Sequence, residues 1–130
     1  MSCLFDSLAP AVCLHPAILR RAIVAYLKTN PKMPNDLHLA DNICYGYGYN
    51  QQENINKNAL VQKYASLMAN PEVWGGEPEI VAFCELFNID VVIHDLYSGK
   101  QFCIESSKHA RKKVHIGFNG NHFTPKYVEI

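Results

Sequence analysis

Apolar residues recur at positions i, i+3 and i+4 in four stretches of the first 90 residues. This spacing places them on one face of a helix. The sequence therefore predicts four helices: one beginning close to Ser2 or Cys3, one over residues 15–30, one over residues 58–70, and one after Gly75-Gly76. In the second helix the recurring set is Ile18, Ala22 and Ala25, and in the third Leu60, Tyr64, Leu67 and Met68 are expected to share one face.

Runs rich in β-branched and aromatic residues cluster in the last third of the chain. Residues 89–95, IDVVIHD, form the strongest predicted strand. Further strands are expected at residues 101–105, 112–118 and 122–128, with turns at 97–100 and 119–120. Helices come first and strands come late, so the sequence predicts an α+β fold, a small, mostly antiparallel sheet packed against helices. The length fits a single domain, 1–130.

Residues 31–57 mix Pro, Gly, Asn and Tyr and predict a long irregular connection, with a short helix near 36–43. A connection of this length is often a binding loop. Tyr45, Tyr47 and Tyr49 alternate with glycine within it. They fit either an aromatic contact surface or a partly packed loop.

Composition argues against several classes of function. Lys plus Arg equals Asp plus Glu, 12 each, so the chain lacks the overall positive charge that nucleic-acid binding usually needs. One basic cluster, residues 108–113, is typical of a solvated loop or strand edge. No apolar stretch reaches the roughly 20 residues of a membrane span, and the N-terminus has no signal-peptide pattern.

The five cysteines form no CxxC pair, which indicates reduced thiols in a cytoplasmic compartment. His and Cys occur at scattered spacings, so the sequence predicts no metal site and no cofactor.

Two residues far apart in the sequence are candidates for chemistry. Cys3 lies where the first helix begins, and the positive end of a helix favours a thiolate. His122 lies between a turn and the last predicted strand. A cysteine at a helix start with a distant histidine is an arrangement of cysteine proteases. Taken alone, each residue also fits a structural role, Cys3 as a small buried residue and His122 as a packed histidine.

Three stretches, in this order, resemble the ovarian tumour (OTU) family of cysteine proteases, most of which are deubiquitinases. Residues 3–5, Cys-Leu-Phe, match the second half of the family's first motif. Residues 74–79, with Trp-Gly-Gly and a following Glu79, match its middle motif, and His122-Phe123 match the last. The resemblance spans nearly the whole chain and implies a papain-like OTU fold.

The resemblance also implies roles. Cys3 would be the nucleophile, and His122 the base that keeps it as thiolate and later protonates the leaving lysine amine. Trp74 and the two glycines would be structural and close the turn between two helices beneath the active-site cleft. If Trp74 is buried, its replacement by alanine should cost roughly 3–5 kcal/mol.

Two features depart from the family pattern. Only Met1 and Ser2 precede Cys3, whereas the family's preceding loop carries an Asp and backbone N–H groups of the oxyanion hole. Either this chain is a trimmed piece or it builds the hole differently. Thr124 stands where many relatives have Asp or Asn to orient the histidine, so an uncharged hydroxyl would take that part. The alternatives are a dyad without a third member, or orientation by Asn119, Asn121, Asp6 or Asp95.

The leading hypothesis is a cysteine isopeptidase that removes ubiquitin or a ubiquitin-like protein from conjugates, with Tyr45, Tyr47 and Tyr49 in the ubiquitin-contacting surface. The alternatives are a protease that cleaves a polyprotein after a Gly-rich sequence and a catalytically inactive OTU-like ubiquitin-binding module. The small size is similar to viral or bacterial members of the family. The expected location is the cytoplasm, which would be that of the host in such a case.

Overall fold

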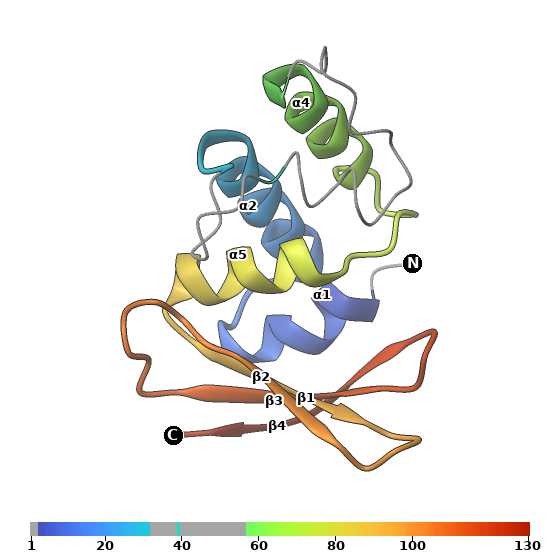
Figure 1. Ribbon diagram of the computed structural model, residues 1–130, viewed down its shortest axis with the longest axis vertical. Coiled ribbons are helices and arrows are strands. Elements are labelled where there is room, and N and C mark those ends of the chain that lie inside the picture. The colour runs from blue at the N-terminus through green and yellow to red at the C-terminus, as the bar shows by residue number, and fades with distance from the viewer. Residues whose placement is uncertain (1–2, 32–38, 40–56) are drawn as a thin grey trace.

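The computed structural model describes residues 3–31, 39 and 57–130. The helices lie together on one face of a four-stranded sheet (Figure 1), so the predicted α+β architecture is confirmed. The elements are α1 (Cys3–Leu8), the 3₁₀ helix η1 (Ala9–Ala11), α2 (Pro16–Thr29), α4 (Lys57–Met68), α5 (Glu77–Phe87), β1 (Asp90–Asp95), β2 (Gln101–Ile104), β3 (Lys113–Phe118) and β4 (Phe123–Glu129).

Most of the predicted connection of residues 31–57 lies outside the described residues. This includes Tyr45, Tyr47 and Tyr49 and, apart from the buried Leu39, the short helix expected near 36–43.

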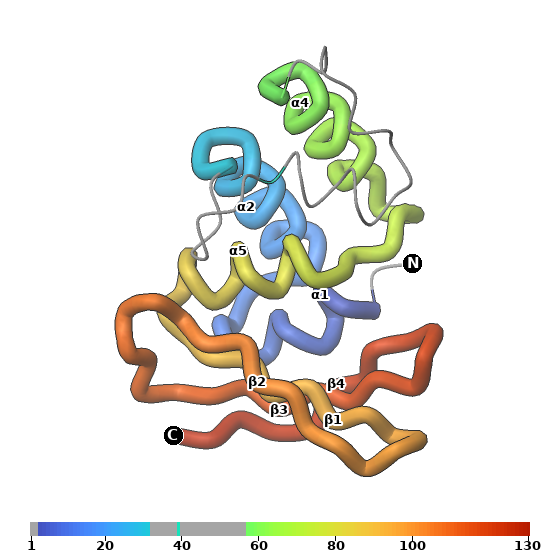
Figure 2. Tube along the Cα trace, in the orientation of Figure 1, coloured from blue at the N-terminus to red at the C-terminus, as the bar shows by residue number. Residues whose placement is uncertain are grey.

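The strand order is β2-β1-β3-β4. The central pair β1 and β3 is parallel, and the two outer pairings are antiparallel. The β1–β2 and β3–β4 turns therefore lie at one end of the sheet, and the connection of residues 105–112 lies at the other (Figure 2). The end with the two turns carries His122, and the other end carries the basic cluster of residues 108–113.

The core forms between the helices and the sheet, and it corrects two predicted helix faces. In α2 the fully buried residues are Leu19, Ile23 and Leu27, whereas Ile18 is 43% exposed. In α4 Leu67 is 50% exposed. Both helices carry apolar residues on neighbouring faces, so spacing alone does not distinguish the buried face from the adjacent one.

Within the described part of the chain, no single helix has the length and apolar character of a membrane span. Only the bent pair of Cys3–Ala11 and Pro16–Thr29, with 95° between the two, meets both conditions together.

Candidate active site

Cys3 is the first residue of α1 and is partly buried. The two residues that follow it, Leu4 and Phe5, are fully buried. α1 packs against β4, the strand that begins directly after His122. The start of α1 is thereby anchored to the core and directed to the end of the sheet that carries the β3–β4 turn.

Gly75 lies directly against α1. A Cβ atom at this position would stand 2.8 Å from Leu4 Cδ2 and 3.1 Å from Phe5 Cε2, so a larger residue would have to displace these two side chains. At Gly76 a Cβ would meet nothing within 4 Å, and its φ is −149°. Neither glycine has a left-handed φ. The missing side chain of Gly75 matters because it leaves room for Leu4, the residue that follows Cys3.

Trp74 lies beside His122. The two ring centroids are 5.6 Å apart, with 48° between the ring planes. Trp74 is 48% exposed, so the burial on which its expected stability cost of roughly 3–5 kcal/mol depends is not met. Because Trp74 contacts His122 and its neighbour Gly75 contacts Leu4, the Trp-Gly segment links His122 to the residue that follows Cys3.

The backbone of His122 is fixed by Asn119. The Asn119 Oδ1 atom accepts N–H bonds from Asn121 (3.0 Å) and His122 (2.7 Å), and the Asn119 N–H donates to the His122 carbonyl (3.1 Å). Gly120 supplies the left-handed φ of 93° that this turn requires. Asn119 thus sets the path of the chain at His122, while among the described residues no hydrogen bond holds the imidazole ring.

Thr124 pairs with Gly117 on β3 and is exposed. A Cβ at Gly117 would stand 2.8 Å from Thr124 Oγ1, so the hydroxyl lies over the glycine. No hydrogen bond joins Thr124 to His122 within residues 57–130. Of the alternative orienting residues, Asp95 uses Oδ1 to accept the N–H groups of Tyr97 and Ser98 in the β1–β2 turn.

Arg20 is a buried residue that the sequence analysis missed. Its guanidinium donates to the carbonyls of Met68 (2.8 Å), Asn70 (3.0 Å) and Val73 (2.9 Å). It also lies 4.2 Å above the Phe5 ring. Burial lowers the pKa of Arg20, and nearby acidic groups oppose this shift. Arg20 therefore ties α1 to the turn that leads into Trp74. The available signal was its i+3 and i+7 spacing to Ile23 and Leu27, which places it on the buried face of α2.

Glu79 is a second buried group of this scaffold. Its carboxyl oxygens accept bonds from the Tyr64 hydroxyl (2.5 Å) and the Gly76 N–H (2.7 Å). Burial raises the pKa of Glu79 to about 7. The Glu79 carboxyl therefore joins α4 to the start of α5, immediately after the Trp-Gly-Gly segment.

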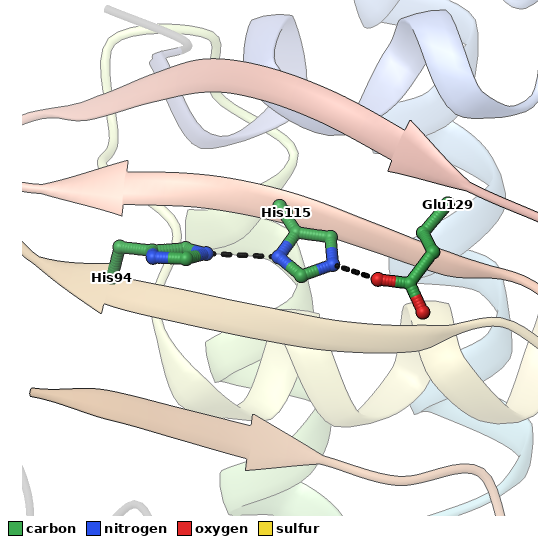
Figure 3. Close-up of polar contacts among 3 residues, drawn as sticks. All are labelled: His94, His115 and Glu129. Atoms are coloured by element: carbon green, nitrogen blue, oxygen red, sulfur yellow. Dashed lines mark hydrogen bonds and ion pairs between the residues drawn. The ribbon is translucent and has the colours of Figure 1, made fainter.

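A separate histidine cluster lies on the face of the sheet that points away from the helices (Figure 3). His94 Nε2 is 2.8 Å from His115 Nδ1, and His115 Nε2 is 3.1 Å from Glu129 Oε1. Tyr127 stacks on His115 with centroids 4.1 Å apart. Burial and the nearby His115 lower the pKa of His94. This cluster was not predicted, because it depends on the parallel register of β1 and β3.

Several solved structures share this fold. Among them, an ovarian tumor (OTU) domain in complex with ubiquitin aligns with a TM-score of 0.65 and 20% identity, covering 98% of this chain and 68% of that chain. An OTU deubiquitinase from Wolbachia pipientis wMel aligns with a TM-score of 0.66 and 17% identity, over 98% and 82%. An OTU deubiquitinase from Wolbachia pipientis wMel bound to ubiquitin aligns with a TM-score of 0.58 and 16% identity, over 95% and 88%.

No curated protein matches the sequence significantly. The family model for OTU-like cysteine proteases matches residues 2–124, nearly the whole chain. Together with the OTU fold of the structure, this match shows that the chain belongs to the OTU-like cysteine protease family, a family of thiol-dependent hydrolases.

Proposed function

We propose that this protein is an isopeptidase that removes ubiquitin or a ubiquitin-like protein from conjugates. The observation that carries the proposal is the Trp-Gly link, which associates the start of α1 with the ring of His122 in a chain of the OTU-like cysteine protease family. Two of the similar structures are complexes with ubiquitin, which supports this substrate class.

In the proposed mechanism, His122 takes the proton of the Cys3 thiol, and the thiolate attacks the carbonyl carbon of the C-terminal glycine of ubiquitin. The carbon–nitrogen bond breaks, and His122 donates its proton to the departing lysine amine. Water, deprotonated by His122, then attacks the thioester and releases Cys3 as a thiol. Thr124 is proposed to help orient the His122 ring.

Two of the other described thiols, Cys84 and Cys103, are less suited to this chemistry. Cys84 is fully buried, its Sγ lies 3.4 Å from the Ile104 carbonyl, and burial raises its pKa to about 12. Burial also raises the pKa of Cys103, and the nearby Asp90 adds to the shift. Both shifts favour the unreactive thiol form at neutral pH.

The substrate is proposed to lie over two surfaces. One is an apolar groove of ≈ 400 Å³ between α5 and the sheet, whose lining includes Ile80, Ile93 and Phe123, the neighbour of His122. The other is the connection that carries Tyr45, Tyr47 and Tyr49. We also propose that the protein acts in the cytoplasm.

The test is covalent capture with ubiquitin that carries a C-terminal propargylamide. We expect one adduct, mapped to Cys3 by peptide mass analysis, and none with Cys3→Ala. Cys103→Ala is the matched control, because Cys103 is also a free thiol and is exposed, and it should form the adduct at the normal rate.

Two outcomes would contradict the proposal and support a different function. Binding of ubiquitin without adduct formation would identify an inactive ubiquitin-binding module. Cleavage of peptides after Gly-Gly, without reaction with the ubiquitin probe, would identify a protease of the polyprotein-cleaving type.

A further inference from the structure

A depression of ≈ 760 Å³ lies at the end of the sheet opposite His122, because its lining includes residues 108–112. Its walls come from the residues after α1, the end of α5 and the connection of residues 105–112. The six residues of β3 run from this end to the turn that carries His122, which is roughly 20 Å of extended strand. The depression, called the basic pocket below, shares no residue with the candidate active site.

The basic pocket combines an apolar floor with a cationic rim. Val12, Leu14 and Phe87 form the floor and are only partly buried. Lys108 and Arg111 are exposed on the rim, with His109 and Lys112 beside them. Among the described residues that line the pocket there is no Asp or Glu. Because the whole chain has a net charge of +0, this positive charge is local.

Hydrogen bonds fix the connection that presents these cations. The Ser106 N–H donates to Asp90 (2.8 Å), and the Ser107 hydroxyl and N–H donate to Glu85 (2.7 and 2.9 Å). At the other end of the connection, Lys112 Nζ donates to the Ala11 carbonyl (2.6 Å).

Two neighbouring carboxylates, Asp90 and Glu85, are thus bonded to serines. Lys108 and Arg111 form no ion pair within the described part of the chain. A ligand would therefore find the charges of Lys108 and Arg111 on a fixed stretch of backbone and without a bound carboxylate to displace.

The chemistry of the pocket favours an acidic peptide over a nucleic acid. An exposed apolar floor is suited to a large apolar side chain, and lysine and arginine on a rim are suited to flanking carboxylates. Nucleic acids are held by long basic surfaces and by aromatic residues that stack on bases. The described rim of the basic pocket carries no Phe, Tyr or Trp, and Phe87 belongs to the floor.

We propose that the basic pocket binds an acidic segment of a partner protein, with an apolar side chain on Val12, Leu14 and Phe87 and carboxylates on Lys108 and Arg111. The site would hold a partner at the end of the molecule away from the candidate active site. The proposal is independent of the ubiquitin chemistry and goes beyond it.

The experiment measures binding of a fluorescein-labelled peptide, Glu-Asp-Glu-Phe-Leu-Asp-Glu-Asp, by fluorescence anisotropy at low and high salt. Lys108→Glu with Arg111→Glu should weaken binding by roughly tenfold or more. Lys100→Glu with Lys126→Glu is the matched control. It makes the same change in net charge at exposed positions outside the pocket and should leave binding within about twofold.

Peptide variants separate the two parts of the pocket. Replacing the acids by Gln and Asn, or Phe-Leu by Gly-Gly, should each abolish measurable binding. Equal losses in the two double variants, or no binding of the acidic peptide, would overturn the proposal. Tighter binding of oligouridylate would overturn it in favour of a nucleic-acid site. Reaction with the ubiquitin probe should be the same in both double variants, so this proposal and the proposed function fail separately.

Discussion

The rings of His115 and His122 are held in opposite ways. Both nitrogens of His115 have partners, and Tyr127 stacks on its face. His122 has a fixed backbone and a neighbouring Trp74, but within the described residues its ring nitrogens have no hydrogen-bond partner. A general base needs a nitrogen that is available to take a proton. The histidine with the complete set of partners is therefore suited to holding the strands together, and the one without them is suited to chemistry.

The largest effect on the reaction rate should come from removing the ring of His122. His122→Ala should reduce reaction with a fluorogenic ubiquitin substrate by roughly 10²–10⁴-fold, because the thiol loses its base. Circular dichroism should show an unchanged fold. Full activity in folded His122→Ala would show that the His122 ring has no chemical function. The difference between His115 and His122 would then say nothing about catalysis.

The buried carboxyl of Glu79 is a third titratable group, and its surroundings affect the stability of the fold. The folded pKa of Glu79 is about 7, against an ordinary 4.5, so the folded state favours the protonated form. Its contribution to stability is present in full below pH 4.5 and is lost as the pH rises through about 7. The contribution is roughly 3 kcal/mol. Denaturant unfolding between these pH values should show this loss, and Glu79→Gln should flatten it. If the stability of Glu79→Gln kept the same pH dependence, the loss of stability would come from a group other than Glu79.

Replacing His115, whose two ring nitrogens both have partners, should affect the stability of the fold and leave the reaction rate unchanged. His115→Phe keeps an aromatic ring against Tyr127 but loses two hydrogen bonds, and should lower the free energy of unfolding by roughly 2 kcal/mol. Thermal melts measure this loss. The rate of the ubiquitin probe, per folded molecule, should not change. A deep loss of that rate with normal stability would connect the outer face of the sheet to the reaction.

Trp74 should act on the position of the His122 ring. Because Trp74 is half-exposed, Trp74→Ala should change the free energy of unfolding by less than about 1 kcal/mol. It should reduce the probe rate by roughly tenfold, which corresponds to about 1.4 kcal/mol. Trp74→Phe keeps a flat ring and should recover most of the rate. A large fall in melting temperature would restore a structural role for Trp74.

The smallest effect should come from the proposed orienting hydroxyl. Thr124 is exposed and uncharged, so Thr124→Ala should slow the probe reaction by only roughly two- to fivefold, with the pH optimum unchanged. Thr124→Ser should be close to the unmodified protein. A loss as deep as that of His122→Ala would place Thr124 at the centre of the mechanism.

The sequence predicted those parts of the fold that depend on local patterns. The β-branched run of residues 89–95 became β1, and the Asn-Gly signal at 119–120 became the turn before His122. The exposure of individual side chains was harder to predict from the sequence. The sequence resemblance implied a structural role for Trp74, with a stability cost only if it is buried, but no local pattern showed that it lies half-exposed beside His122. The contact of His94 with His115 depends on a strand register that no local pattern contains.

The guanidinium of Arg20 makes distant positions depend on one another. It donates to the carbonyl of Val73, the residue immediately before Trp74, from helix α2. A substitution at Arg20 should therefore be thermodynamically coupled to one at Trp74, so that their combined effect on activity differs from the sum of the two. The surroundings of His122 should therefore depend, through Trp74, on a side chain that lies 53 residues before Val73 in the sequence.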